Sequence, residues 1–444
     1  MSSGPAPVDT TALNGAQHRP PHAEFMQIWE EGYVSNHVSF ENMQLPGLFI
    51  VDGAPLRGEN QRIDRSKIRE YVDSMMASSP HFRLRLQRSA LGLTPPAWVP
   101  DSAFDLSRHI VFADEIVDIG TADLRRLAGA YGGLMSLRHP LWRVHVTELA
   151  NGDVAVGVVM HHASMDGMSG MKLFGSMFQK KADDALPSPR DPFASERAPS
   201  AWQLPRLAFQ QWRQRQVSLA AAWKDYWSFP FIRRARRVVA RNLLPLRFGM
   251  GGEKARAKML PPVHSDYRQL DAAAVGRRAR GFGGSLSDLQ VGAVIGSWDG
   301  EERIVRLRFP VSFHSNDRPH IRNHVRDMEV AGDADADIAD IVASVSAQVA
   351  RREAILAGEP VPGLPIGYST LLPWLSRPAF FCGGELRAMI PFPASLGRDQ
   401  LAAAGIIYNG SLFVGANMPI YRDANAIVGR IYELMTGMPD PGRP

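Results

Sequence analysis

The sequence predicts an α/β (α+β) protein made of two sandwiches of helices and sheets. Its 444 residues exceed what one hydrophobic core usually holds, so two domains are expected. Hydrophobic residues make up 45% of the chain and charged residues 21%, which is typical of a globular protein. Helical and strand periodicities alternate in both halves, which favours two α/β sandwiches over a bundle or a solenoid.

The predicted organisation has four parts. Residues 1–22 are rich in Pro, Gly, Ser and Thr and are expected to be a disordered tail. Residues 23–182 form a first α/β domain, residues 183–252 a basic, tryptophan-rich crossover, and residues 253–444 a second α/β domain. The tail lacks the apolar core of a secretory signal, so a cytoplasmic location is expected.

In the first half, helices and strands alternate. Apolar residues at helical spacing predict two helices, and period-two alternation predicts the strands between them. The predicted elements are the helix Asp64–Ser78, the strand in HFRLRLQR, the helix Thr121–Met135, the strand RVHVTEL and the strand DVAVGVVM. The last strand is apolar on both faces, which is typical of a central strand that is covered on both sides.

The second half repeats this alternation. A helix is expected at Ser285–Trp298, a strand in RIVRLRFPVSF, and an amphipathic helix around Ile338–Val349. The run Gln400–Tyr421 carries no charge, but Asn409-Gly410 within it is a two-residue hairpin turn signature. We therefore expect two buried strands there instead of a membrane helix.

The crossover carries much of the positive charge. The net charge is +5, and five arginines gather in FIRRARRVVARNLLPL, just after a tryptophan-rich stretch. Nucleic acid, a phosphorylated cofactor or anionic lipid could explain such a cluster, and so could a solvated helix face. The pattern of tryptophans interleaved with arginines is compatible with an interfacial helix or with buried packing at the domain junction. These tryptophans are Trp202, Trp212, Trp223 and Trp227.

The run HHASMDG, from His161 to Gly167, carries the chemistry. Neighbouring residues on a strand point to opposite faces, so His161 and His162 cannot both enter one cavity if the strand stays regular. His162 lies on the same face of the strand as Val158 and Met160. A neutral imidazole there can take a proton from a hydroxyl or amine near neutral pH.

The rest of the run supports that imidazole. Asp166 is close enough to anchor the loop, by a salt bridge or by capping the next helix, and Gly167 leaves space where a substrate must pass. A metal site is disfavoured because adjacent strand histidines diverge and no further Cys or His lies close in sequence. Cys382, the single cysteine, is disfavoured as a nucleophile because its apolar setting keeps the thiol protonated.

HHASMDG resembles the HHxxxDG motif of the CoA-dependent acyltransferase superfamily of chloramphenicol acetyltransferase-like enzymes, carnitine acyltransferases and peptide-synthetase condensation domains. Within it the chain is most similar to the bacterial wax ester synthase/diacylglycerol acyltransferase family. The resemblance extends roughly from Phe25 to Met435. The segments that carry it are HFRLRLQRSALGLTPPAWVPDSAFDLSRHI, HPLWRVHVTEL, SLSDLQVGAVIGSW, LRFPVSF and YNGSLFVGANM.

The resemblance implies two chloramphenicol acetyltransferase-like domains with a central tunnel at their interface. It implies His162 as general base, His161 as a supporting residue, and Asp166 as the residue that holds the loop. Gly167 would keep the tunnel open, and Ser287 and Asp288, at the family's Asn-Asp pair, would contact substrate. No metal and no cofactor is implied beyond acyl-CoA as co-substrate.

Two activities remain open at this point. The first is an O-acyltransferase that moves a fatty acyl group from acyl-CoA to diacylglycerol or a fatty alcohol, without an acyl-enzyme and with peripheral contact to the inner membrane or a lipid droplet. The second is a tailoring or condensation-type enzyme that esterifies or amidates a specialised metabolite, including from a carrier-protein thioester. The second activity is considered because the family's NVPGP string is not recognisable near Ser369–Pro378, which puts the acceptor alcohol in question. A non-enzymatic module that binds nucleic acid or membrane is disfavoured by the intact HHASMDG, and no nucleic-acid partner is expected.

Overall fold

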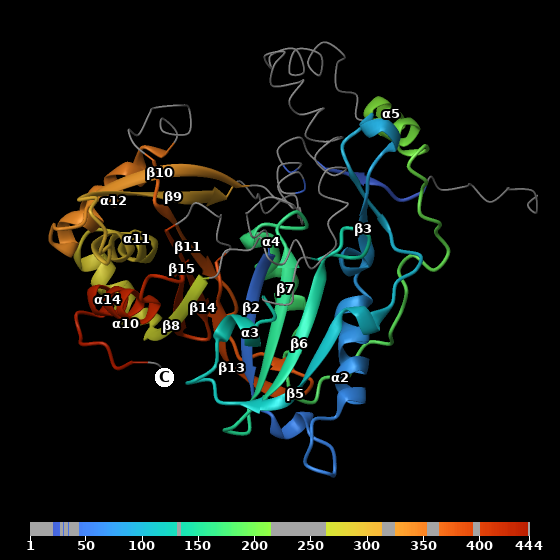
Figure 1. Ribbon diagram of the computed structural model, residues 1–444, viewed down its shortest axis with the longest axis horizontal. Coiled ribbons are helices and arrows are strands. Elements are labelled where there is room, and N and C mark those ends of the chain that lie inside the picture. The colour runs from blue at the N-terminus through green and yellow to red at the C-terminus, as the bar shows by residue number, and fades with distance from the viewer. Residues whose placement is uncertain are drawn as a thin grey trace, which may run out of the picture.

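The structure, a computed structural model, describes residues 21–26, 30, 34, 44–130, 135–214, 263–312, 325–352, 364–393 and 400–442. Two six-stranded sheets lie side by side, with helices packed against them, as Figure 1 shows. The predicted α/β class with two sandwiches is therefore confirmed. The arginine cluster, Trp223 and Trp227 lie outside the described residues.

The first sheet has the order β12-β13-β2-β7-β6-β5. Its central strand β7 is buried at all eight positions, as the sequence predicted. The strands are β2 (Gln44–Val51), β5 (Ile110–Val117), β6 (Trp142–Leu149), β7 (Val154–His161), β12 (Phe380–Phe381) and β13 (Gly384–Pro391). Because β13 pairs with β2, a segment from the second half of the chain completes this sheet. The expected domain boundaries stay a prediction.

The second sheet has the order β10-β9-β11-β14-β15-β8. Asn409 and Gly410 both have positive φ and join β14 to β15, so the predicted hairpin is confirmed. The strands are β8 (Val263–Asp271), β9 (Ile304–Ser312), β10 (Val325–Asp333), β11 (Gly367–Pro373), β14 (Leu401–Tyr408) and β15 (Ser411–Pro419). A small third sheet contains β1 (Glu24–Phe25), β3 (Leu84–Gln87) and β4 (Ala97–Pro100).

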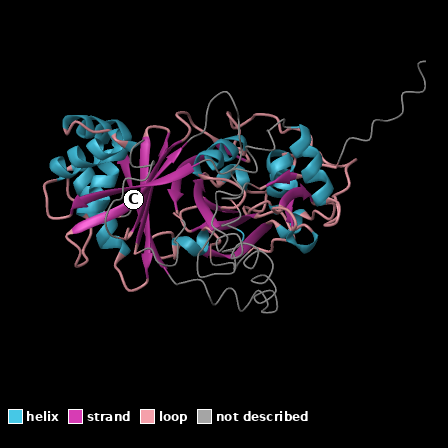
Figure 2. Cartoon of the chain, turned by 90° about the horizontal axis from the view of Figure 1, so that it is seen from above, coloured by secondary structure: helices cyan, strands magenta, loops and turns pink. Residues whose placement is uncertain are grey.

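Helices cover the second sheet on one face and form a core with it. They gather at one end of the molecule in the view from above (Figure 2). These helices are α10 (Ala272–Gly281), α11 (Leu286–Gly296), α12 (Ile338–Ala350) and α14 (Ala424–Thr436). Both helices predicted in this half, at Ser285 and at Ile338, are confirmed.

The helices described in the first half match the predicted helix Asp64–Ser78 and fall short of the predicted helix Thr121–Met135. They are α2 (Arg65–Val72), α3 (Leu124–Leu127), α4 (Gly167–Ser176) and α5 (Leu204–Gln214). Past Val72 the chain continues as a π-helical turn, Asp73–Ala77. The expected helix Thr121–Met135 is wrong in length, because α3 ends before Gly129, which has a φ of +74°. Residues 131–134 lie outside the described part.

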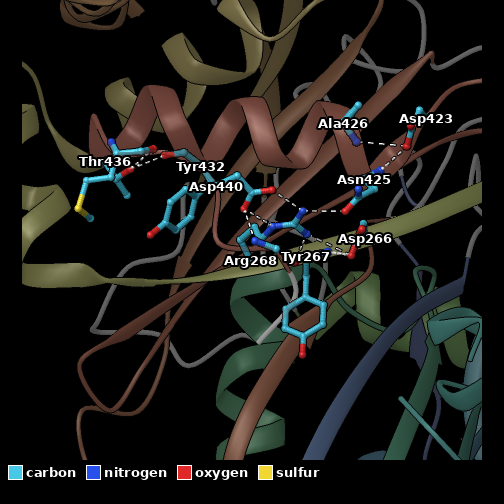
Figure 3. A network of polar contacts seen from close by, with 11 residues as sticks. Asp266, Tyr267, Arg268, Asp423, Asn425, Ala426, Tyr432, Thr436 and Asp440 are labelled. Atoms are coloured by element: carbon cyan, nitrogen blue, oxygen red, sulfur yellow. Dashed lines mark hydrogen bonds and ion pairs between the residues drawn. The ribbon is translucent and has the colours of Figure 1, made fainter. Parts of the chain in front are cut away.

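A polar network joins β8 to the chain beyond α14 (Figure 3). Arg268 is only 1% exposed, and it donates to both carboxylate oxygens of Asp440 at 2.6 and 2.7 Å. It also donates to the Asn425 side chain at 2.7 Å. These charge-assisted bonds hold residues 437–442 against the second sheet.

No helix in the described ranges has both the length and the apolarity needed to cross a membrane.

Candidate active site

The motif HHASMDG forms the turn between β7 and α4. The His161 N–H donates to the Leu141 carbonyl at 3.0 Å, and the His161 carbonyl accepts from the Ser164 N–H at 2.9 Å and from its hydroxyl at 2.6 Å. These bonds end the strand at His161 and fold the chain back. The turn is therefore fixed by backbone contacts on both sides of the first histidine.

His161 is completely buried. Its Nδ1 lies 3.1 Å from the Ala163 amide nitrogen, and because a backbone N–H can only donate, Nδ1 is the acceptor. The neutral ring then carries its proton on Nε2. His161 does not line the cavity described below, so its contacts serve the shape of the turn.

His162 lies just past the end of β7 and is half-buried. It lines a cavity together with Met160, which precedes it by two residues on the same side. The strand therefore brings one of the two histidines to the cavity and keeps the other in the protein interior.

Asp166 is the N-cap of α4. One carboxylate oxygen accepts from the Ser169 N–H at 2.8 Å, and the side chain is 1% exposed. A carboxylate at a helix N-terminus satisfies a backbone donor and interacts favourably with the helix dipole. This contact fixes where α4 begins, and with it the position of Gly167.

Two further contacts seat α4 between the sheets. The indole of Trp374, just past β11, donates to the Met171 carbonyl at 2.9 Å, and the Tyr71 hydroxyl donates to the Met177 carbonyl at 2.6 Å. Figure 1 shows α4 at the boundary of the two sheets, beside β11. The helix is therefore attached to both halves of the chain.

The cavity lies where the two sheets face each other and has a volume of about 280 Å³. Its wall is mostly apolar, with five methionines among the lining residues. From the first sheet and α4 it is lined by Leu45, Pro46, Gly47, Met160, His162, Met165, Asp166, Gly167, Met168, Gly170, Met171, Phe174, Met389 and Pro391. From the second half it is lined by Arg308, Pro310, Asp327, Tyr368, Thr370, Leu371, Leu372, Ala404 and Ile406, and Phe392 and Pro393 follow β13.

The structure brings His162, Asp166 and Gly167 together on this wall but not Ser287 and Asp288. Asp288 belongs to a capping box with Ser285 at the start of α11, where it accepts from the Ser285 N–H at 2.8 Å. That role is structural. The substrate contact expected of Ser287 and Asp288 stays a prediction.

Sequence reasoning missed four polar lining residues, Arg308, Asp327, Tyr368 and Thr370. They come from the neighbouring strands β9, β10 and β11. Arginines alternate with apolar residues in RIVRLRF, so the period-two pattern already placed Arg306 and Arg308 on one face. The pattern did not show that this face of the strand lines the cavity between the two sheets.

Cys382 lies in the turn between β12 and β13 and is not part of the cavity wall. It is 4% exposed, and burial raises the pKa of its thiol to about 11. A thiol with this pKa is protonated at neutral pH. Within the described ranges, no group of three or more His, Cys, Asp or Glu side chains could hold a metal ion.

Two facing α/β lobes with a histidine motif on an interface cavity define the chloramphenicol acetyltransferase-like class. A family model, the wax ester synthase/diacylglycerol acyltransferase catalytic domain, matches residues 47–227. The resemblance seen in the sequence is thereby confirmed over this segment, which is less than half of the chain.

Curated relatives are similar to this chain over about a quarter of its length. A putative diacylglycerol O-acyltransferase of Mycobacterium tuberculosis is 29% identical over 121 residues, 27% of this chain and 24% of the relative. A probable diacylglycerol O-acyltransferase of the same species is 31% identical over 123 residues, 27% of each chain. The chain thus matches about a quarter of the length of these relatives.

Solved structures share the fold over nearly the whole chain. The wax ester synthase/diacylglycerol acyltransferase from Marinobacter aquaeolei superimposes with a TM-score of 0.60 at 14% identity, over 93% of this chain and 98% of that one. The first condensation domain of the calcium-dependent antibiotic synthetase gives 0.55 at 13% identity, over 95% and 98%. The predicted two-domain condensation-like architecture is therefore confirmed.

Proposed function

We propose that this protein is an O-acyltransferase that moves a fatty acyl group from acyl-CoA to a lipophilic alcohol, with diacylglycerol or a fatty alcohol as acceptor. One observation carries the proposal: His162 lies on the wall of a mostly apolar cavity between two lobes. The family match supports the same chemistry. We also propose that the reaction takes place in the cytoplasm.

In the proposed reaction, His162 acts as general base. The imidazole takes the proton of the acceptor hydroxyl while its oxygen attacks the thioester carbonyl. The tetrahedral intermediate then collapses, the C–S bond breaks, and the imidazolium returns the proton to the departing CoA thiolate. No acyl-enzyme is needed, which agrees with a buried, protonated Cys382 away from the cavity.

The neighbouring residues assist without reacting. His161 and Asp166 hold the turn and the start of α4, and Gly167 gives the passage its width. The methionines and Phe174 provide an apolar, adaptable surface for acyl chains. A cavity with little water also strengthens the polar interactions made at the reacting carbonyl.

The test follows free thiol and ester formation with palmitoyl-CoA and either dioleoylglycerol or hexadecanol. His162→Ala is expected to lower kcat by about 10²- to 10⁴-fold without changing the thermal unfolding temperature. His264→Gln, an exposed histidine on the second sheet, is the matched control and is expected to stay at the parental rate. Unchanged turnover in His162→Ala would remove His162 as the base.

A second candidate is a tailoring enzyme that esterifies or amidates a polar specialised metabolite. The charged side chains of Arg308 and Asp327 on the cavity wall favour it, because a polar acceptor offers them hydrogen bonds that a hydrocarbon acceptor does not. Thiol release only with a hydroxylated or amine metabolite, or only with a carrier-protein thioester, would select this candidate. Thiol release with hexadecanol selects the first.

We also propose peripheral contact with an anionic lipid surface. Leu91, Leu93 and Trp202 are 75%, 63% and 71% exposed, and a backbone bond from Ala90 to Ala201 holds their two segments together. Leu91 has a φ of +53°, an unfavourable conformation for leucine at an exposed loop tip. These residues form the apolar tip of this surface.

The flanking charges suit acidic lipid. Arg206 and Arg213 of α5 are exposed, and residues 88–96 and 198–214 contain no acidic side chain. Flotation with phosphatidylglycerol vesicles is expected for the parent protein and lost in Leu91→Glu/Trp202→Glu. Val111→Glu, an exposed apolar position on β5, is the control. Equal flotation of all three proteins would contradict the contact.

A further inference from the structure

Thr370 of β11 brings a hydroxyl group to the cavity wall close to the HHASMDG motif. A Cβ on Gly167 would lie 3.1 Å from the Leu372 side chain, so Leu372 marks where the motif meets β11. Thr370 precedes Leu372 by two residues, which places both side chains on one face of the strand. Two residues correspond to about 7 Å along a parallel strand.

The other side-chain donors that the second sheet brings to the cavity wall begin farther from the motif. Tyr368 precedes Leu372 by four residues, which corresponds to about 13 Å. Arg308 is the paired neighbour of Tyr368 in the ladder between β9 and β11, so its backbone lies at the same level. Thr370 is therefore the side-chain donor of this sheet that starts nearest to the motif.

The Thr370 hydroxyl is available to a substrate. Thr370 is half-buried and lines the cavity, whereas its neighbour Ser369 points to the opposite face of β11 and is completely buried. Within the residues that the structure describes, the Thr370 hydroxyl has no hydrogen-bond partner. It can therefore donate to a bound group without first losing a bond to the protein.

The backbone at Thr370 is held from the other side of the sheet. Gln290 of α11 is completely buried, and its amide donates to the Ser369 hydroxyl at 3.1 Å and to the Thr370 carbonyl at 2.7 Å. Gly405 of β14, which pairs with Leu371, makes room for this side chain, because a Cβ on Gly405 would clash with the Gln290 Oε1. These contacts fix the position from which the Thr370 side chain enters the cavity.

Acyl transfer requires a fixed donor of this kind. When the acceptor oxygen attacks the thioester carbonyl, the carbonyl oxygen takes up negative charge, and it gives the charge up again when the C–S bond breaks. His162 serves the attacking oxygen, so the carbonyl oxygen needs a different donor. Preorganised donors aimed at such an oxyanion are usually the largest electrostatic contribution to catalysis.

We propose that Thr370 is a further catalytic residue, whose hydroxyl donates a hydrogen bond to the oxyanion of the tetrahedral intermediate, and that Gln290 is its positioning residue. The inference rests on the proposed acyl transfer. His162 comes from the wall of the first sheet and Thr370 from the wall of the second. A thioester carbonyl between them meets the acceptor on one side and the donor on the other. The proton of the hydroxyl stays on Thr370 throughout.

Substitutions of Thr370 test the donor. Thr370→Val keeps the shape of the side chain and removes the hydroxyl, so kcat with palmitoyl-CoA and hexadecanol is expected to fall by about 10²- to 10³-fold with KM unchanged. Thr370→Ser keeps a hydroxyl and is expected to recover most of the lost rate. Thr436→Val makes the same change at the end of α14, outside the cavity wall, and is the matched control. Equal kcat in Thr370→Val and the parent protein would overturn the proposal.

A double variant tests the positioning residue. Gln290→Met removes both hydrogen bonds to β11 and is expected to lower kcat by about 10- to 100-fold, because the hydroxyl of Thr370 is then misplaced. If Gln290 acts through Thr370, Gln290→Met lowers kcat no further once Thr370→Val is present. Equal losses in the two backgrounds would remove Gln290 as the positioning residue.

Binding separates this proposal from the proposed reaction. Dodecyl trifluoromethyl ketone forms a tetrahedral hydrate that resembles the intermediate, so calorimetry with this ketone detects the donor without turnover. Affinity that falls in Thr370→Val but not in Thr436→Val supports the donor even if no thiol is released. Thiol release that His162→Ala abolishes and Thr370→Val leaves unchanged overturns the donor and leaves the acyl transfer standing.

Discussion

The side chain of Leu372 lies against the backbone of Gly167, so that a Cβ on Gly167 would meet the Leu372 Cδ1 at 3.1 Å and Cδ2 at 3.3 Å. The contact joins the first residue of α4 to β11 of the other sheet. It lies on the cavity wall, beside the HHASMDG motif. The spacing between the lobes at this point therefore depends on the absence of a side chain.

Gly167→Val is expected to lower kcat/KM by about tenfold or more, because overpacking by added methyl groups displaces α4 or β11, typically at 1–3 kcal/mol. Gly175→Ala is the matched control on the same helix. Its Cβ would meet neighbours at 3.7 Å, an ordinary contact, so parental activity is expected. Activity and thermal unfolding are measured on both variants, and a fully active Gly167→Val would contradict the argument.

The role of Gly167 illustrates what the sequence could predict. The motif, the end of the strand and the start of the helix are local features, and each followed from residue patterns within about twenty positions. The neighbour of Gly167, by contrast, comes from a strand some two hundred residues later. No local pattern specifies that contact, nor the return of β13 to pair with β2.

The stability of the protein is expected to fall in mild acid because of buried histidines. His109 is 3% exposed, lies 4.4 Å from Trp142 ring to ring, and its Nδ1 lies 2.8 Å from the Trp142 carbonyl. The carbonyl only accepts, so Nδ1 carries the proton. Burial lowers the pKa of His109 from 6.5 to about 4, and burial lowers that of His145 to about 4 as well.

The folded state loses stability in acid because unfolding takes up protons at these histidines. Between pH 6.5 and 4 the unfolded chain binds protons at these rings and the folded chain does not, so stability is full above pH 6.5 and decreases toward pH 4. At pH 5 His109 alone is expected to remove about 2 kcal/mol from the free energy of unfolding. Urea unfolding at pH 7 and pH 5 measures this. His109→Asn should show a smaller difference between the two pH values; an identical difference would contradict the assignment.

The Arg268–Asp440 pair is expected to stabilise the second half strongly. Arg268 is 1% exposed, so removing Asp440 takes two charge-assisted hydrogen bonds from a buried cation, which keeps the buried Asp266 at 3.5 Å (Figure 3). Asp440→Ala should lower the free energy of unfolding by about 3–5 kcal/mol. The hydrogen bond from Arg268 lowers the pKa of Asp440, so this stabilisation is present at neutral pH and is lost only as acid protonates the carboxylate.

An exposed pair provides the contrast. Arg303, whose side chain is 70% exposed, contacts Asp333 at 2.7 Å. Asp333→Ala is expected to cost less than about 1 kcal/mol, because water screens such pairs. Chemical denaturation measures the free energy of unfolding of both variants. Similar losses in Asp440→Ala and Asp333→Ala would show that burial does not determine how much an ion pair contributes to stability. The sequence could not separate these pairs, because burial depends on the packed fold.

Cys382 is expected to be unreactive and dispensable for turnover. Burial raises the pKa of its thiol to about 11, so the thiolate that attacks electrophiles is scarce at neutral pH. Iodoacetamide at pH 7.5 should alkylate the folded protein slowly and the urea-unfolded protein fast, as followed by mass spectrometry. Cys382→Ala should keep the parental rate of thiol release from palmitoyl-CoA. A loss of activity in Cys382→Ala with normal thermal unfolding, or a covalent palmitoyl adduct on the parent protein, would replace direct transfer at His162 by a thioester intermediate.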